Sequence, residues 1–303
     1  MAAAVIVRLP LYLSSPAFLM EVLLYVDDVL FLAACKAGMV WIGSVLLFLV
    51  ALGVPFRWDR CRGGTQVGIG YWADFWEYRT GISEKRAAWL ADWMTEQVSG
   101  GATDMRDFVA VLGRLCFSMG PLEYLRPFIA PLFAWAAAVG PRWRVQLPWP
   151  VAFLFEFLAA EFKGGGRVEV VQTKVADIGL AFRADAKAEG QVVRVGGWEC
   201  IGDTRPDSAR WFAVDLNKKN APWAFARGEP FRTIASLELF ATLLCVVLFG
   251  ASWPKGARGA VRLQGITHNL GNTFALTKLM SSKFPLVVIL AELAAQLRSQ
   301  AWR

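Results

Sequence analysis

The sequence predicts a multidomain protein of mixed α+β and α/β class, and two observations predict it. Between residues 83 and 162 the sequence predicts several helices, and in residues 105–115 the apolar residues recur at intervals of three and four, the period of a helix with one buried face. Beyond a glycine-rich stretch at residues 163–167, short β-type runs follow in the order strand, strand, strand, helix, strand, helix, which is an α/β order. We therefore predict three parts, residues 1–78, 79–165 and 166–303.

The composition is apolar and basic. Of 303 residues, 56% are hydrophobic and 19% charged, the formal net charge is +7, and 14 residues are Trp. Such a surface suits polyanions, nucleic acid above all, and equally an anionic membrane. Base stacking on the Trp side chains is one interpretation. The spacing of most of them favours core packing instead, as for Trp72, Trp76, Trp89 and Trp93.

The cysteines are five, widely scattered, and contain no Cys-x-x-Cys pair. They are Cys35, Cys61, Cys116, Cys200 and Cys245. This pattern predicts reduced, buried thiols of an intracellular protein, cytoplasmic or nuclear, and neither a disulfide framework nor a zinc site.

Two adjacent carboxylates, Asp27 and Asp28, interrupt the apolar run at residues 23–31 where two strand-like segments meet. Burying one of them unpaired would cost several kcal/mol or force it to take up a proton. A hairpin turn that holds both at the surface avoids this cost and lets them bind a metal. A plain Asp-Asp turn is the alternative interpretation.

A helix is predicted over residues 36–51, with Gly53 and Pro55 as stop signals, followed by a strand over residues 66–71. Residues 38–56 carry no charge and reach the ~20 residues that a spanning helix requires. This run supports an alternative hypothesis, a small membrane protein anchored by residues 38–56.

The block at residues 79–165 is predicted to be helical. Ser83 can cap a helix that ends near residue 98, and residues 103–104 can cap a second helix with apolar residues at spacings of three and four. Three prolines, at positions 121, 127 and 131, predict short helices in the following stretch. A further helix is predicted over residues 152–162, and residues 163–167 are a predicted linker.

In residues 166–303, two acidic residues lie within predicted strands or helices. Asp185 ends an apolar strand at 182–186, and further strands are predicted over 192–199, 209–216 and 261–267. Glu238 stands alone among apolar residues in a predicted helix, and His268 directly follows the last of these strands. A helix over residues 270–280 completes the pattern.

The Tyr-Val-Asp-Asp motif at residues 25–28 resembles the metal-binding hairpin in the palm of retroelement reverse transcriptases. The resemblance implies that Asp27 and Asp28 bind Mg²⁺ with an earlier Asp and activate the primer hydroxyl. It places Arg60 near the incoming phosphates and Gly70 and Tyr71 in the primer grip. The helices that follow resemble the thumb and connection, in which Arg106 and Arg126 are candidates for contacts with duplex nucleic acid.

The last block resembles a ribonuclease H domain, in which four acids bind two Mg²⁺ ions. Asp185 and Glu238 match the first two acids, and His268 stands where the third, an Asp, is expected. The fourth acid is expected after the C-terminal helix, where this sequence stops at Arg303. An imidazole is a poor ligand for a hard cation such as Mg²⁺.

These resemblances imply a fragment of a retroelement polyprotein of the long-terminal-repeat or tyrosine-recombinase kind, similar to an RNA-directed DNA polymerase with ribonuclease H. Because the hairpin begins at residue 25, the first palm Asp has no room before it, and two of the four ribonuclease H acids are missing. We expect the chain to be catalytically inactive as it stands, with residual binding of RNA–DNA hybrid or duplex nucleic acid. The missing polymerase portion in another chain is an expected partner. A surviving Mg²⁺ nuclease that uses Asp185, Glu238 and an acid from elsewhere is a third hypothesis.

Overall fold

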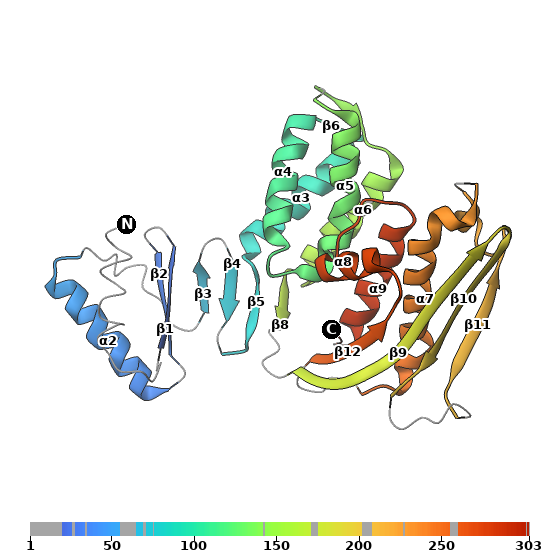
Figure 1. Ribbon diagram of the computed structural model, residues 1–303. Helices are drawn as coiled ribbons and strands as arrows, with labels where there is room; N and C mark the ends of the chain where they lie inside the picture. The colour runs from blue at the N-terminus through green and yellow to red at the C-terminus, as the bar shows by residue number, and fades with distance from the viewer. Residues whose placement is uncertain are drawn as a thin grey trace. The chain divides into compact units, whose positions relative to one another are not determined.

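The computed structural model describes residues 20–25, 28–33, 35–54, 65–68, 71–74, 76–141, 143–170, 175–201, 208–226, 228–254, 260–300 and 302. The chain contains both helices and sheets (Figure 1) and divides into two compact units, Met1–Arg79 and Thr80–Arg303. The mixed α and β class predicted from the sequence is confirmed at this level.

The first unit contains a hairpin followed by a helix. Strands β1 (Met20–Tyr25) and β2 (Asp28–Ala33) pair antiparallel with Tyr25 opposite Asp28. Helix α2 (Lys36–Ala51) buries Val45 and Leu49, and its bounds are those predicted. In place of one strand over residues 66–71, two short strands pair antiparallel, β3 (Thr65–Gly68) and β4 (Tyr71–Asp74).

The second unit begins with a helical part. Strand β5 (Arg79–Ile82) precedes helices α3 (Glu84–Gly100) and α4 (Met105–Ser118). Both predicted caps are confirmed: Ser83 accepts a hydrogen bond from the Arg86 amide, and Asp104 accepts from the amides at 106 and 107. Short strands β6 (Ala102–Thr103) and β7 (Val145–Gln146) pair antiparallel.

The remaining helical part runs through η2 (Glu123–Leu125), α5 (Arg126–Val139), α6 (Trp149–Lys163) and strand β8 (Val168–Val170). The prediction of short helices here was wrong, because α5 continues through Pro131 for 14 residues. Pro131 lacks one backbone donor, and the fully buried Ile129 and Leu132 beside it stabilise the helix by packing.

A four-stranded sheet follows, formed by β9 (Val175–Glu189), β10 (Val192–Glu199), β11 (Trp211–Leu216) and β12 (Ala260–Ile266). Its order is β11-β10-β9-β12. The first three strands in sequence pair antiparallel, and β12 lies parallel to β9. Trp302 adds a parallel bridge to Val261 beside β12.

Helices cover one face of this sheet (Figure 1). Helix α7 (Ile234–Phe249) packs on β9 and β10, and α9 (Leu286–Ser299) packs on α7. Along the chain, α8 (Leu270–Lys278) follows β12 and precedes α9. The 3₁₀ turns η3 (Pro222–Phe225), η4 (Pro230–Thr233) and η5 (Gly250–Ser252) flank α7. The core includes Leu237, Leu239, Val246, Leu290 and Leu293.

Within the described residues, one helical segment, Pro230–Ser252, is long and apolar enough to cross a membrane by length and composition. Its mean hydropathy is 2.2, and 61% of its apolar stretch is buried inside the protein, as in a core helix. Helix α2, the centre of the 38–56 hypothesis, has 16 residues and falls below the length expected for a span.

Candidate functional site

Asp185 lies on the long strand β9, opposite Gly196 of β10. Residues alternate between the two faces of a strand, and Asp185 belongs to the exposed set, with Ala184 buried beside it. Its side chain is 59% exposed. Its Oδ1 accepts a hydrogen bond from the Ala186 amide at 2.9 Å, which leaves the rest of the carboxylate facing outward.

Glu238 lies on α7 and is 7% exposed, so its carboxylate needs a partner. Thr267 provides one, because its Oγ1 donates to Glu238 Oε2 at 2.7 Å. Thr267 directly follows β12, so this bond fixes the end of that strand against α7.

His268 is the next residue, and its Nδ1 lies 3.7 Å from Asp185 Oδ1. The consecutive residues Thr267 and His268 therefore contact the two acids that lie 53 positions apart in the chain, one on β9 and one on α7. We call Asp185, Glu238, Thr267 and His268 together the acid corner.

Hydrogen bonds hold the acid corner in place. The Asn269 amide donates to Thr267 Oγ1 at 3.4 Å, and the Asn269 side chain caps α8 by accepting from the Asn272 amide at 3.2 Å. Asn272 is fully buried, and its Nδ2 donates to the carbonyl of Ala235 on α7 at 2.8 Å. Sequence reasoning missed Thr267 and Asn272, although the Asn-x-x-Asn spacing is typical of a helix start.

The donor set at the acid corner does not fit Mg²⁺. Mg²⁺ requires near-octahedral oxygen ligands, whereas this corner presents one outward carboxylate, one carboxylate bonded to a hydroxyl, and an imidazole. In the part of the chain that the structure describes, no group of three His, Cys, Asp or Glu side chains is placed to hold a metal ion.

The polymerase-like residues are only partly described. Asp27, Arg60 and Gly70 lie outside the described residues. Asp28 begins β2, and Tyr71 begins β4 as a half-buried residue. They belong to the first unit, whereas the acid corner belongs to the second.

The two remaining arginines lie in the helical part of the second unit. Arg106 is exposed in the first turn of α4, whereas Arg126 pairs with Glu123 at 3.0 Å. Arg106 thus presents its guanidinium to solvent, as a phosphate contact requires, and the guanidinium of Arg126 is already engaged.

A second polar cluster, which sequence reasoning missed, lies around Arg298 of α9. Its guanidinium pairs with Glu161 at 2.9 Å and with Glu169 at 2.8 Å, and its centre lies 3.6 Å from the centroid of the Tyr124 ring. The single hydroxyl proton of Tyr124 is shared between two acceptors, a Glu161 carboxylate oxygen at 3.1 Å and the Gly166 carbonyl at 2.9 Å. Burial raises the pKa of the Tyr124 phenol above its ordinary value. Residues 163–167, predicted as a linker, are therefore tied into the fold.

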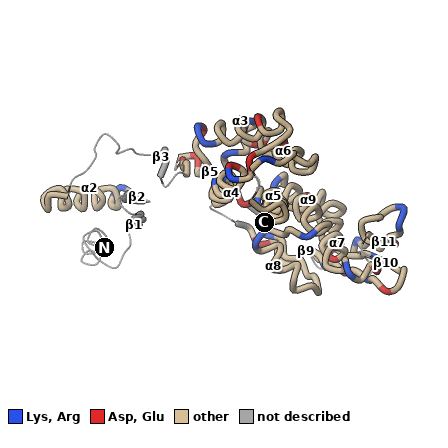
Figure 2. The backbone as a smooth tube through the Cα atoms, turned by 90° about the horizontal axis from the view of Figure 1, so that it is seen from above, with Lys and Arg blue, Asp and Glu red and all other residues tan. Residues whose placement is uncertain are grey.

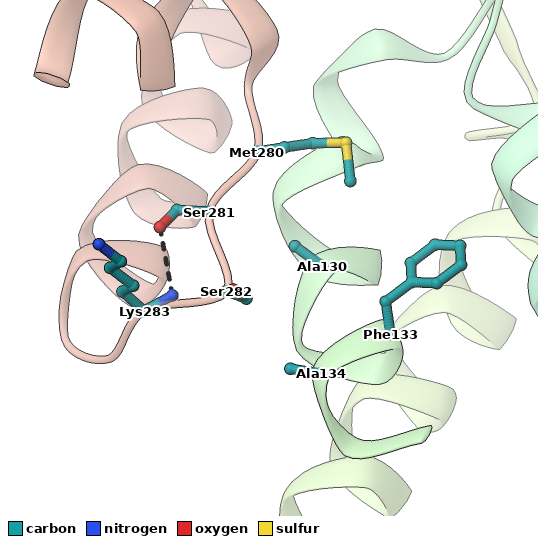
Figure 3. Close-up of a pocket in the computed structure, with 7 residues that line it drawn as sticks. All are labelled: Ala130, Phe133, Ala134, Met280, Ser281, Ser282 and Lys283. Carbon is teal, nitrogen blue, oxygen red and sulfur yellow. Dashed lines mark hydrogen bonds between the residues drawn. The ribbon is translucent and has the colours of Figure 1, made fainter. Parts of the chain in front are cut away.

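An open cleft of about 550 Å³ lies between α5 and the loop that follows α8 (Figure 3). Its wall is formed by Ala130, Phe133 and Ala134 on one side and by Met280, Ser281, Ser282 and Lys283 on the other. None of these residues belongs to the acid corner or to the candidate residues named from the sequence.

The thiols differ from the sequence prediction. Cys245 is buried, and burial raises its pKa to about 12. Cys35 and Cys116 are exposed, and Cys200 is half-buried, so the prediction of buried thiols was wrong for these positions. Two of them lie outside the apolar stripe of a helix: Cys35 precedes α2, and Cys116 is not among the buried residues of α4.

Comparison with models of protein families finds no match to this chain, and a search of curated proteins finds no related sequence.

Proposed function

We propose that the chain is a fragment of a retroelement polyprotein whose second unit is a ribonuclease H-like domain with a disabled nuclease site. The observation that carries the proposal is the convergence at the acid corner. Asp185 on the first strand of the sheet, Glu238 on the helix after the third strand, and His268 after the fourth strand are linked through residues 267–268. The strand order β11-β10-β9-β12 with β12 parallel to β9 is the order that such a domain would require.

The disabled state follows from two features of the corner. His268 replaces a carboxylate, which removes one negative charge from a site meant for divalent cations. The Glu238 carboxylate is bonded to Thr267 and is nearly excluded from solvent. We therefore expect the chain to retain binding of RNA–DNA hybrid without cleaving it.

The test is cleavage of the RNA strand of an RNA–DNA hybrid in the presence of Mg²⁺, with the unaltered protein and His268→Asp. We expect cleavage only by H268D, because the variant restores the carboxylate at the end of β12. His268→Asn is the matched control, since it has nearly the same shape as Asp without the charge, and it should stay inactive. Asp185→Asn added to H268D should abolish the gain.

Two results would overturn the disabled-site proposal. The first is cleavage by the unaltered protein that Asp185→Asn removes, which would make the site active as it stands. The second is the absence of hybrid binding by both the unaltered protein and H268D, each folded by circular dichroism, because the proposed domain retains hybrid binding.

Hybrid binding itself is tested by its dependence on salt. Binding through Lys and Arg releases counterions from the nucleic acid, so affinity should fall linearly with log salt concentration. An interaction that is unchanged between about 50 and 200 mM salt would contradict binding through phosphates.

The first unit supports the polymerase part of the proposal less directly. Its hairpin places Asp28 opposite Tyr25, and α2 packs on the hairpin through Val45 and Leu49. We propose that the first unit derives from a retroelement polymerase, in which Asp27 and Asp28 were the metal-binding pair. The missing polymerase portion, in another chain, is a proposed partner.

One observation favours a second candidate function, membrane attachment through residues 38–56. Beyond Lys36, α2 has no charged residue, as Figure 2 also shows, and several of its apolar side chains are exposed, including Val40 at 69% and Leu47 at 72%. Extraction of membranes with alkaline carbonate separates the two functions. A chain that stays in the pellet supports attachment, and one released to the supernatant supports the nucleic-acid proposal.

A further inference from the structure

The open face of the four-stranded sheet carries two tryptophans side by side. Trp198 of β10 lies opposite Trp211 of β11 on one side and opposite Arg183 of β9 on the other. Directly paired residues of antiparallel strands project to the same face, so these three side chains form one row across the sheet. We call them the indole row. Trp198 is 44% exposed and Trp211 72% exposed.

The helices lie on the other face of the sheet. A side chain at Gly197, the neighbour of Trp198, would meet Cys245 Sγ of α7 at 2.4 Å, so position 197 faces the helices. Trp198 therefore faces away from α7, and Figure 1 shows α7 and α9 on a single side of β9 and β10. Within the described residues, the indole row is open to solvent.

Among the described residues, no other aromatic ring contacts either indole. Ring contacts in this part of the protein join Phe182 to Trp253 and Phe212 to Phe249, and both phenylalanines of the strands lie on the inner face of the sheet. Trp253 shows the contrast, because it is 3% exposed and donates to Glu199 at 2.7 Å as a core residue.

The charges around the indole row are arranged asymmetrically. Four residues along each strand from the two tryptophans, and on the same face, Arg194 forms a bidentate pair with Asp215 at 2.6 and 2.9 Å, so that acid is neutralised. Arg183, within the row, forms no ion pair in the described part of the chain. Between the indole row and this pair lies Gly196, which has no side chain. Its partner on β9 is Asp185 of the acid corner.

We propose that the indole row is a stacking platform for the bases of single-stranded nucleic acid, with Arg183 contacting the phosphate between two bases. Bases within a duplex stack on one another and offer no free face, whereas single-stranded bases stack on aromatic side chains. The positive net charge of the chain, +7, favours a polyanion as the occupant. A protein partner would require a contiguous apolar patch, but Asp185 lies in the next row on this face, and the Arg194–Asp215 pair lies in the row beyond it.

This platform goes beyond the proposed function, because it needs neither metal nor cleavage and selects single strands over hybrid. The probe is a fluorescein-labelled 12-residue oligouridylate, titrated with protein while anisotropy is recorded, in parallel with a blunt RNA–DNA hybrid of the same length. Trp198→Ala and Trp211→Ala should each weaken oligouridylate binding about 5- to 100-fold. Hybrid binding should change little.

Matched controls distinguish stacking from folding. Trp143→Ala and Trp149→Ala remove indoles that are 86% and 79% exposed in the helical part, and binding should be unchanged. Trp198→Phe combined with Trp211→Phe keeps aromatic faces and should retain most of the affinity, with circular dichroism confirming the fold. Arg183→Gln should weaken binding and lower the slope of log affinity against log salt by about one.

The platform would be overturned by oligouridylate binding that both Ala variants leave intact, by affinity for hybrid alone, or by no binding to either probe. Self-association that W198A and W211A abolish, without binding of the oligouridylate, would equally overturn it in favour of a contact between copies. The cleavage test with H268D is independent, so failure of the proposed function and failure of the platform are separate results.

Discussion

Helices α7 and α2 have nearly the same sequence signature and opposite surroundings. Each has 16 residues and one charged residue, Glu238 in α7 and Lys36 in α2. In α7 ten residues are buried, between the sheet on one side and α9 on the other. In α2 only Gly38, Val45 and Leu49 are buried. An apolar helix is thus buried by the elements that the fold supplies beside it, and its composition alone does not decide this.

The difference should be largest in the reactivity of the two cysteines, Cys245 within α7 and Cys35 just before α2. A pKa of about 12 leaves about one Cys245 thiol in 10⁴ ionised at pH 8, and the thiolate is the reactive form. We expect iodoacetamide to modify the exposed Cys35 at least about 1000-fold faster than Cys245. Peptide mass spectrometry after timed quenching measures both sites in one sample.

The pH dependence has a defined sign. Because the raised pKa of Cys245 disfavours the thiolate, its modification should accelerate about tenfold per pH unit until the pH reaches the pKa. Full denaturation in urea is the control, and the two sites should then react at similar rates. Equal rates in the folded protein would remove the contrast between the helices.

Truncation of a core residue of α7 should cause the next largest effect. Leu237 is fully buried, so Leu237→Ala should lower the free energy of unfolding by about 2–5 kcal/mol, through lost burial and the cavity left behind. Leu248→Ala on the same helix is the matched control, since Leu248 is 50% exposed and its loss should cost less than about 0.5 kcal/mol. Urea unfolding followed by circular dichroism measures both, and similar losses would show that α7 is not a core helix.

Sequence patterns predicted the elements whose signals are local. Strand β10 was predicted with its observed bounds, residues 192–199, and the caps at Ser83 and Asp104 follow from side chains that bond amides two or three residues away. Glu238 was predicted to lie in a helix, and α7 extends over 16 residues because its apolar run contains no stop signal before Gly250.

The features that could not be predicted depend on pairings between distant residues. Strand β9 was expected over 182–186 and spans 15 residues, because pairing with β10 and β12 extends it. Thr267 and Glu238 are 29 positions apart, and Arg298 and Glu161 are 137 apart. The indole row depends on strand register, and neither Trp76 at 78% exposure nor Trp89 at 42% fits the core packing that was expected of them.

Helix α9, which packs on α7, is itself held in place by ion pairs of Arg298 with Glu161 and Glu169. Arg298→Ala would leave Glu161 and Glu169 without their cation, and these side chains are only about a quarter exposed. We expect a loss of about 1–3 kcal/mol in the free energy of unfolding. Lys163→Ala is the control, because it breaks a pair with Asp92 in which both side chains are more than half exposed, and it should cost at most about 1 kcal/mol. Equal losses in thermal unfolding would show that Arg298 contributes no more than a surface charge.

The smallest losses of stability are expected for truncations in α2, and they test which of its side chains are buried. Leu49 is 2% exposed but contacts mainly half-buried neighbours, so Leu49→Ala should cost about 1–3 kcal/mol of the stability of the first unit, less than Leu237→Ala costs the second. Leu47→Ala should cost less than about 0.5 kcal/mol, because Leu47 is 72% exposed. Hydrogen exchange of the α2 amides reports this unit by itself. If L47A destabilised α2 as much as L49A, another part of the protein would have to cover the exposed side of α2, and the contrast with α7 would disappear.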